Sequence, residues 1–209
     1  ETQRITVTGS ATQQAPAVSG FGDMPLSRVP FSATVIDQRA LQDAGISSLA
    51  DITRLDAGIT DAYNAPGYIN QLAVRGFTLD NRFNFRRDGL PINAETAIGQ
   101  ANKQSLEVLK GTSGLQAGTS APGGLLNLVV KRPRERVRDA SVAWTQDGTL
   151  EAAFDVGART EGIGWRVNAN GARLDPRTND ARGRRWLAAG AVDARLGNTL
   201  VEAEVEASR

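Results

Sequence analysis

The sequence predicts an α+β domain over residues 29–133, followed by antiparallel β-strands over residues 134–209. Two observations support this prediction. Helix-capping residues and Gly-rich turns dominate before Pro133, whereas apolar and polar residues alternate with a period of two after it. Because successive strand residues point to opposite faces, this alternation predicts a sheet that is apolar on one face and wet on the other.

The α+β domain is predicted to begin with a strand and two short helices. Residues 33–36 read Ala-Thr-Val-Ile, which favours a strand. Asp37 can cap a short helix, and Gly45 can end it. The pattern Ser-Leu-Ala-Asp at residues 48–51 is a capping box, which predicts a second helix over residues 52–55.

The region after Pro133 is predicted to contain five strands. All three tryptophans, Trp144, Trp165 and Trp186, fall on the apolar face at a strand end, which is typical of the aromatic girdle of a membrane barrel. A soluble, half-exposed sheet would show the same alternation, so the alternation alone favours a barrel only slightly. The strands are expected near residues 140–145, 150–158, 165–172, 186–196 and 199–207.

Composition excludes several classes of function. The chain has no cysteine and no histidine, so Ser-His-Asp or Cys-His catalytic groups and thiolate metal sites are impossible. Its 24 basic residues nearly balance its 23 acidic ones, which argues against a nucleic-acid partner. No phosphate-loop spacing occurs, and no apolar run of about 18 residues indicates a transmembrane helix. Enzymes that use a pair of carboxylates remain possible on composition, although nothing in the sequence singles out such a pair.

The most informative segment is residues 106–133, LEVLKGTSGLQAGTSAPGGLLNLVVKRP. It resembles the end of the plug domain of TonB-dependent outer-membrane transporters, and its closing Lys-Arg-Pro resembles the ferric-siderophore branch. The strand at residues 71–77, which contains Arg-Gly-Phe, and the turn at residues 88–92 resemble earlier parts of the same domain. Ala57 and Thr112 stand where the family commonly has proline.

This resemblance implies a transporter and not an enzyme. The protein would import a ferric siderophore across the bacterial outer membrane. The iron would be held by the siderophore, so the resemblance implies no catalytic residues, no cofactor and no protein metal site. Its fold would be a plug followed by the first strands of an incomplete transmembrane β-barrel, because a plugged lumen of this kind needs about 22 strands. We expect the sequence that ends at Arg209 to be a fragment with a whole plug and roughly the first quarter of its barrel.

The resemblance also implies two groups of contacts within the receptor. Arg75 and Lys110 would pair with barrel carboxylates. Loops at the extracellular apex of the plug would help to bind the siderophore, since aromatic and basic side chains suit a bulky, oxygen-rich and often anionic chelate. The candidates are Tyr63, Asn64, Asn81, Arg82 and Phe83.

Residues 1–28 resemble a TonB-box segment followed by a linker. The β-branched run Ile5, Thr6, Val7 and Thr8 would add a strand to the sheet of the periplasmic TonB protein, which supplies energy for transport.

Two alternatives remain at this point. The first is a soluble ligand-binding module in which a plug-like domain precedes a small β-sandwich, with no transport. The second keeps the transporter but changes the cargo to cobalamin, haem or a glycan.

Overall fold

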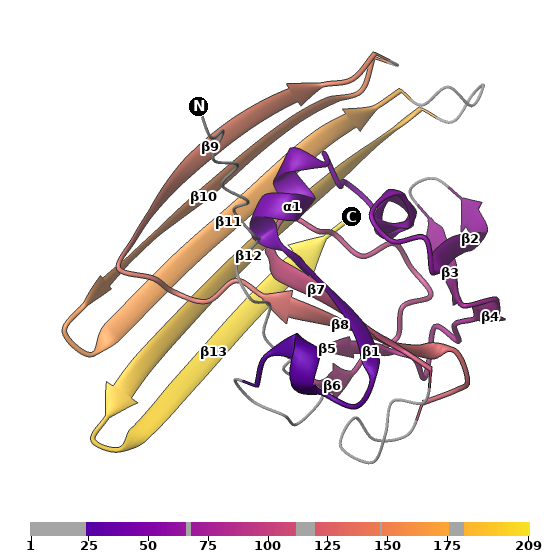
Figure 1. Ribbon diagram of the computed structural model, residues 1–209. Coiled ribbons are helices and arrows are strands. Elements are labelled where there is room, and N and C mark those ends of the chain that lie inside the picture. The colour runs from indigo at the N-terminus through magenta and orange to yellow at the C-terminus, as the bar shows by residue number, and fades with distance from the viewer. Residues whose placement is uncertain (1–23, 66–67, 112–119, 147, 176–181) are drawn as a thin grey trace, which may run out of the picture.

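The computed structural model describes residues 24–65, 68–111, 120–146, 148–175 and 182–209. They form an α+β domain and a sheet of long strands that lies along one side of it (Figure 1). The elements in chain order are η2 (Leu26–Arg28), β1 (Ser32–Asp37), α1 (Gln38–Asp43), η3 (Leu49–Arg54), β2 (Ile59–Ala65), β3 (Ile69–Val74), β4 (Phe77–Thr78), β5 (Phe85–Arg87), β6 (Leu90–Pro91), β7 (Lys103–Lys110), β8 (Gly124–Val130), β9 (Arg136–Trp144), β10 (Leu150–Thr160), β11 (Ile163–Leu174), β12 (Gly183–Leu196) and β13 (Thr199–Ser208).

The α+β domain contains two small sheets around one apolar core. The larger sheet has the order β1-β7-β8-β5-β6, and the smaller one has the order β2-β3-β4. Strands β7 and β8 are antiparallel, whereas β5 joins β8 in parallel. The core residues come from both sheets, from α1 and η3, and from the loops between elements: Ile36, Leu41, Leu49, Ile52, Ile59, Leu72, Val74, Leu79, Phe85, Ala94, Leu106, Val108, Leu126 and Leu128.

Local capping explains where α1 and η3 begin. The Asp37 carboxylate accepts a hydrogen bond from the Ala40 backbone N–H at 2.8 Å, which caps α1 as predicted. Gly45 follows α1 with φ of +59°, a left-handed conformation that glycine adopts without strain. The Asp51 carboxylate accepts from the Ser48 backbone N–H at 2.8 Å. The second helix is a 3-10 helix that begins at Leu49, three residues before the predicted start.

Strands β9–β13 form one antiparallel sheet in sequence order, with β9 and β13 at its two edges. The sheet does not close, so the predicted fold class is confirmed. The two-sheet sandwich of the alternative hypothesis is not formed by these described strands. No described helix is both long and apolar enough to cross a membrane.

We call the two sides of this sheet the outer face and the inner face. The outer face carries the predicted apolar set, including Trp144, Trp165 and Trp186, which are 75%, 43% and 46% exposed. The inner face is turned toward the α+β domain (Figure 1). Its residues include Asp155, Arg166, Asn168, Leu187, Ala189, Ala191, Asp193, Glu202, Glu204 and Glu206.

Contact with the α+β domain explains why alternation is weakest in β12. Leu187, Ala189 and Ala191 lie on the inner face, yet they are apolar and buried. A Cβ atom added to Gly99 would lie 2.4 Å from Cδ1 of Leu187, so the two parts approach closely there. An inner face that is covered by protein does not need to be polar.

Candidate functional site

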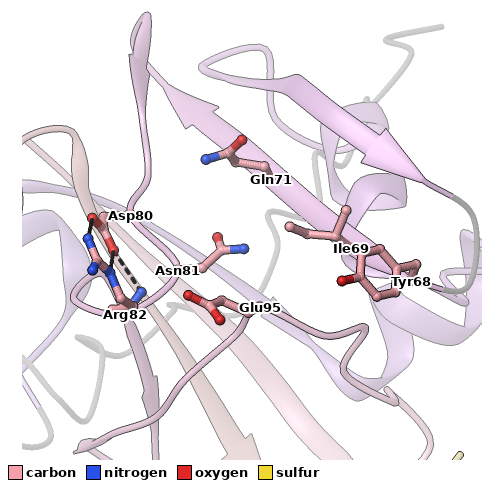
Figure 2. Close-up of a pocket in the computed structure, with 7 residues that line it drawn as sticks. All are labelled: Tyr68, Ile69, Gln71, Asp80, Asn81, Arg82 and Glu95. Atoms are coloured by element: carbon pink, nitrogen blue, oxygen red, sulfur yellow. Dashed lines mark hydrogen bonds and ion pairs between the residues drawn. The ribbon is translucent and has the colours of Figure 1, made fainter.

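A cavity of about 380 Å³ lies between β3 and the loops that follow β4 and β6 (Figure 2). It brings together Asn81 and Arg82, two of the five predicted ligand residues. Its lining residues are Tyr68, Ile69, Gln71, Asp80, Asn81, Arg82 and Glu95. Four of the polar ones were missed by the sequence analysis: Tyr68, Gln71, Asp80 and Glu95.

Arg82 is held by its neighbour Asp80. Its Nε and Nη2 atoms donate to the two carboxylate oxygens at 3.3 and 3.2 Å, and its backbone N–H donates to the same group at 2.8 Å. These hydrogen bonds lower the pKa of Asp80 and raise the pKa of Arg82. The guanidinium also lies 5.2 Å from the centre of the Phe83 ring. Arg82 is therefore an ion-paired cation.

The loop that carries Asn81 is tied down on both sides. The Asn84 amide donates to the backbone oxygens of Ala121 and Gly124 at 2.7 and 2.5 Å, while its oxygen accepts from the Asp80 backbone N–H. The backbone oxygen of Asn81 accepts from Ala94 N–H at 2.8 Å. Asn81 is only 7% exposed. These hydrogen bonds fix the backbone of the loop and so hold the Asn81 side chain in the cavity wall.

Tyr63 and Phe83 are not among the described residues that line the cavity. Tyr63 and Phe83 expose 61% and 48% of their surface. Asn64 lies in β2, where its backbone is paired with Asn70 of β3. Their role in ligand binding stays a prediction.

Lys110 forms an ion pair with Asp56 at 2.6 Å, and both side chains are largely buried. Burial opposes ionisation of Asp56, but hydrogen bonds from Lys110 and Thr34 outweigh that effect and lower its pKa. This partner belongs to the α+β domain and not to the barrel. A contact between Lys110 and a barrel carboxylate beyond β13 stays a prediction.

Arg75 lies in a turn between β3 and β4 and has φ of +51°, which is unusual for a residue other than glycine. Its backbone N–H donates to the Gly58 oxygen at 2.8 Å, and its side chain is exposed. Among the described residues no carboxylate forms an ion pair with it. Its predicted barrel partner stays a prediction, and the predicted TonB box at residues 5–8 lies outside the described residues.

Other cations of the α+β domain do pair with carboxylates of the long sheet. Lys103 donates to Glu206 of β13 at 2.9 Å, although Lys103 is only 2% exposed. Arg87 pairs with the same carboxylate at 2.9 Å and also with Glu204. Burial lowers the pKa of Lys103 despite the nearby Glu206. Ion pairs between the α+β domain and the long sheet, which were expected for Arg75 and Lys110, are thus formed by Lys103 and Arg87.

A second buried cluster joins the end of the α+β domain to β10 and β11. Asp155 accepts from Lys131 at 2.9 Å and from the Nε and Nη2 atoms of Arg166 at 2.8 and 2.7 Å. Lys131 is the lysine of the Lys-Arg-Pro ending. Burial lowers its pKa, opposed by the bond to Asp155. Two sequence features could have indicated these ion pairs: the Lys-Arg-Pro motif, and the acidic residues at inner-face positions of β10 and β13.

No group of three or more acidic side chains with metal-ligand geometry occurs among the described residues. The cavity therefore offers hydrogen bonds, one ion pair and aromatic surface, which suits recognition of a polar small molecule.

Comparison with known proteins identifies the domain. Residues 25–125 match the TonB-dependent Receptor Plug Domain family. The chain is 34% identical over 113 residues to the ferripyoverdine receptor of Pseudomonas aeruginosa, covering 50% of this chain and 13% of that protein. It is 30% identical over 146 residues to the catecholate siderophore receptor Fiu of Escherichia coli, covering 65% of this chain and 19% of that protein.

The fold comparison agrees with this match. The pyoverdine outer-membrane receptor FpvA from Pseudomonas aeruginosa, solved with bound pyoverdine, has a TM-score of 0.83 at 23% identity. That alignment covers 94% of this chain but 30% of the solved chain. The chain thus spans less than a third of the length of these receptors. Residues 25–125 are therefore a plug domain of the TonB-dependent receptor family, which consists of transporters, and the open sheet that follows has the fold of the N-terminal part of solved receptor structures.

Proposed function

We propose that this chain belongs to a receptor that imports a ferric siderophore across the bacterial outer membrane with energy from TonB. The observation that carries the proposal is the polar cavity of the plug, which Asn81, Arg82 and Tyr68 line together (Figure 2). The names of the relatives, a ferripyoverdine receptor and a catecholate siderophore receptor, support iron chelates as the cargo class.

The proposed organisation assigns one task to each part of the chain. Residues 1–28 hold the TonB box, at residues 5–8, and a linker. Residues 29–133 are the plug, which closes the lumen and presents the ligand cavity. Residues 134–209 are the first strands of the barrel, whose apolar outer face meets outer-membrane lipid. In this proposal the exposed tryptophans of that face lie at the membrane interface.

The ion pairs between the plug and the sheet suit a plug that stays docked at rest and rearranges during transport. Lys103, Lys131 and Arg87 are paired with carboxylates of the sheet at 2.9 Å. Such pairs are broken by water that enters the interface, because water solvates each separated charge. In the proposal, a pull from TonB on the N-terminal segment rearranges the plug against these contacts.

The test is transport by the full-length receptor in a bacterial strain that lacks its own ferric-siderophore receptors. Radiolabelled iron is supplied as ferric pyoverdine, ferric enterobactin or ferrioxamine B, with and without a functional TonB. We expect surface binding of at least one chelate in both strains and uptake only where TonB works. Uptake that persists without TonB would contradict the energy source. Transport of cobalamin, haem or a glycan with no iron chelate taken up would contradict the cargo.

A further inference from the structure

The charged side chains that line the plug cavity carry a net negative charge. Its charged side chains are two carboxylates, Asp80 and Glu95, and one guanidinium, Arg82. We propose that it binds a cationic hydrogen-bond donor, an ammonium or guanidinium group on an arm of the chelate, and not the anionic oxygens around the iron. This inference rests on the proposed function and adds the chemistry of the group that the cavity selects.

Arg82 is not available to an anionic ligand at low cost. Two of its side-chain nitrogens already donate to both oxygens of Asp80. The sticks in Figure 2 show the guanidinium turned toward Asp80 and away from Glu95. An anion that approached the remaining Nη1 donors of Arg82 would lie close to the Asp80 carboxylate, whose negative charge opposes it. The pair therefore contributes little net charge to the cavity.

Asn81 supplies an acceptor that lacks a donor. Its side-chain oxygen is buried and has no hydrogen-bond partner in the part of the chain that the structure describes. In Figure 2 its amide lies between Gln71 and Glu95, facing the space that these side chains enclose. A buried polar atom without a partner is unfavourable, so a ligand N–H that reaches it gains more than an ordinary surface hydrogen bond.

Glu95 supplies the negative charge. Its backbone N–H donates to the Asn93 side chain at 2.8 Å, which sets the turn that carries it. No described cation lies within ion-pair distance of its carboxylate. A ligand cation between Glu95 and the Asn81 oxygen would satisfy both, and the Tyr68 ring at the same cavity adds a surface on which a cation can lie. A ligand carboxylate at this place would meet the like charge of Glu95.

The experiment uses three synthetic ferric tris-hydroxamate chelates with the same iron centre. Their pendant arms end in a primary ammonium, an acetamide or a carboxylate. Dissociation constants are measured on the purified full-length receptor by quenching of tryptophan fluorescence. We expect the ammonium chelate to bind about tenfold more tightly than the carboxylate chelate, the ratio typical of one charge-assisted contact.

Variants then assign the preference to the cavity. Glu95→Gln, an exposed and nearly isosteric change, should reduce the ammonium preference to about threefold or less. Asn81→Leu should weaken the ammonium and acetamide chelates together, since both donate N–H to the oxygen that is lost. Asp43→Asn is the matched control, because it removes the same charge from an exposed plug position outside the cavity lining. It should leave the order of affinities unchanged.

Three results would overturn the inference. These are equal affinities for the three arms, tighter binding of the carboxylate arm, or an ammonium preference that Glu95→Gln does not alter. Failure of all three chelates to bind would also reject the inference, because their arms present the group that the cavity is proposed to select. In each case, TonB-dependent uptake of another ferric siderophore would leave the proposed function standing, so the two failures can be told apart.

Discussion

Lys103 should be a principal anchor of the plug on the barrel, and Lys103→Met tests this role. The lysine is 2% exposed, donates to Glu206 at 2.9 Å and donates to the Asn102 side chain at 2.6 Å. Methionine keeps most of the length and apolar character of the lysine stem but removes the charge. The substitution therefore isolates the ion pair from the packing.

The size of the expected destabilisation depends on the hydrogen-bond partners that Glu206 keeps when Lys103 is replaced. Removal of one partner from a buried ion pair costs about 3–5 kcal/mol when the other charge is left without compensation. Glu206 would still accept from Asn102 at 2.7 Å and from Arg87 at 2.9 Å. We therefore expect a loss of about 2–3 kcal/mol in the free energy of plug docking, at or below the lower end of that range.

The assay is the urea midpoint for release of the plug in the full-length receptor. A fluorophore on an Asp43→Cys variant would report release, and it would be the only cysteine label in these 209 residues, which contain no cysteine. Arg54→Met is the control, because Arg54 forms an exposed pair with Asp51 at 3.4 Å and such a pair contributes about 0–1 kcal/mol.

The double variant Lys103→Met with Glu206→Gln completes a thermodynamic cycle. It should be less destabilised than the sum of the two single variants, because the second change removes a charge that the first left unpaired. Equal midpoints for Lys103→Met and Arg54→Met, or strict additivity in the cycle, would refute the reasoning.

Three further predictions concern other parts of the chain. The lowered pKa of Asp56 means that its carboxylate stabilises the plug above its ordinary value of 3.8, and that this contribution is lost as the pH falls through the lower folded-state pKa; Asp56→Asn should flatten the pH dependence of the urea midpoint between about pH 5 and pH 2, and an unchanged profile would contradict this. Gly124→Ala should destabilise the plug strongly, because its Cβ would lie 2.1 Å from the Leu109 backbone oxygen, whereas Gly89→Ala meets open space and only backbone strain; similar urea midpoints for the two variants would count against this. Val7→Pro should abolish radiolabelled iron uptake while Val7→Ala largely preserves it, since proline removes the N–H that strand addition requires; equal loss of uptake in both would indicate side-chain recognition, and surface binding of the chelate should persist in either variant.

Features that depend on neighbours in sequence were predictable. The cap formed by Asp37, the turn at Gly45 and the bonds between Ser48 and Asp51 all join residues at most four positions apart or depend on one residue's backbone. Their prediction needs only the intrinsic preferences of these residues. The second helix was placed three residues late, although a capping box with Ser48 at the N-cap and Asp51 at N3 itself makes Leu49 the first helical residue.

The five-stranded sheet was predictable for a similar reason. Period-two alternation is a property of each strand alone, and it located all five strands after Pro133. Strand β12 was the least regular in sequence because Leu187, Ala189 and Ala191 face the plug. That contact depends on the tertiary structure, and in the sequence it was visible only as a weaker alternation of apolar and polar residues.

The sequence predicted two lining residues of the cavity but not how its charged side chains are arranged. Asn81 and Arg82 were named as ligand candidates from the family resemblance, and both line the cavity. The pairing of Arg82 with Asp80 and the arrival of Glu95 beside Asn81 were not predicted. Residues of β3 and two separate loops meet there only after the small sheet has packed on the core, so the chemical character of the cavity became clear only from the structure.

By itself, the sequence determined the family resemblance, the kind of each element and the two faces of the long sheet, because capping, turn and alternation signals act over a few residues. Only the tertiary structure decided which charges meet. Lys110 pairs with Asp56, 54 residues away, whereas Lys103 pairs with Glu206, 103 residues away. Many acidic residues were equally eligible partners in the sequence. The packing inside the plug selects the partner of Lys110, and the packing of the plug against the long sheet selects the partner of Lys103, because a buried charge is stable only where a partner lies within hydrogen-bond distance.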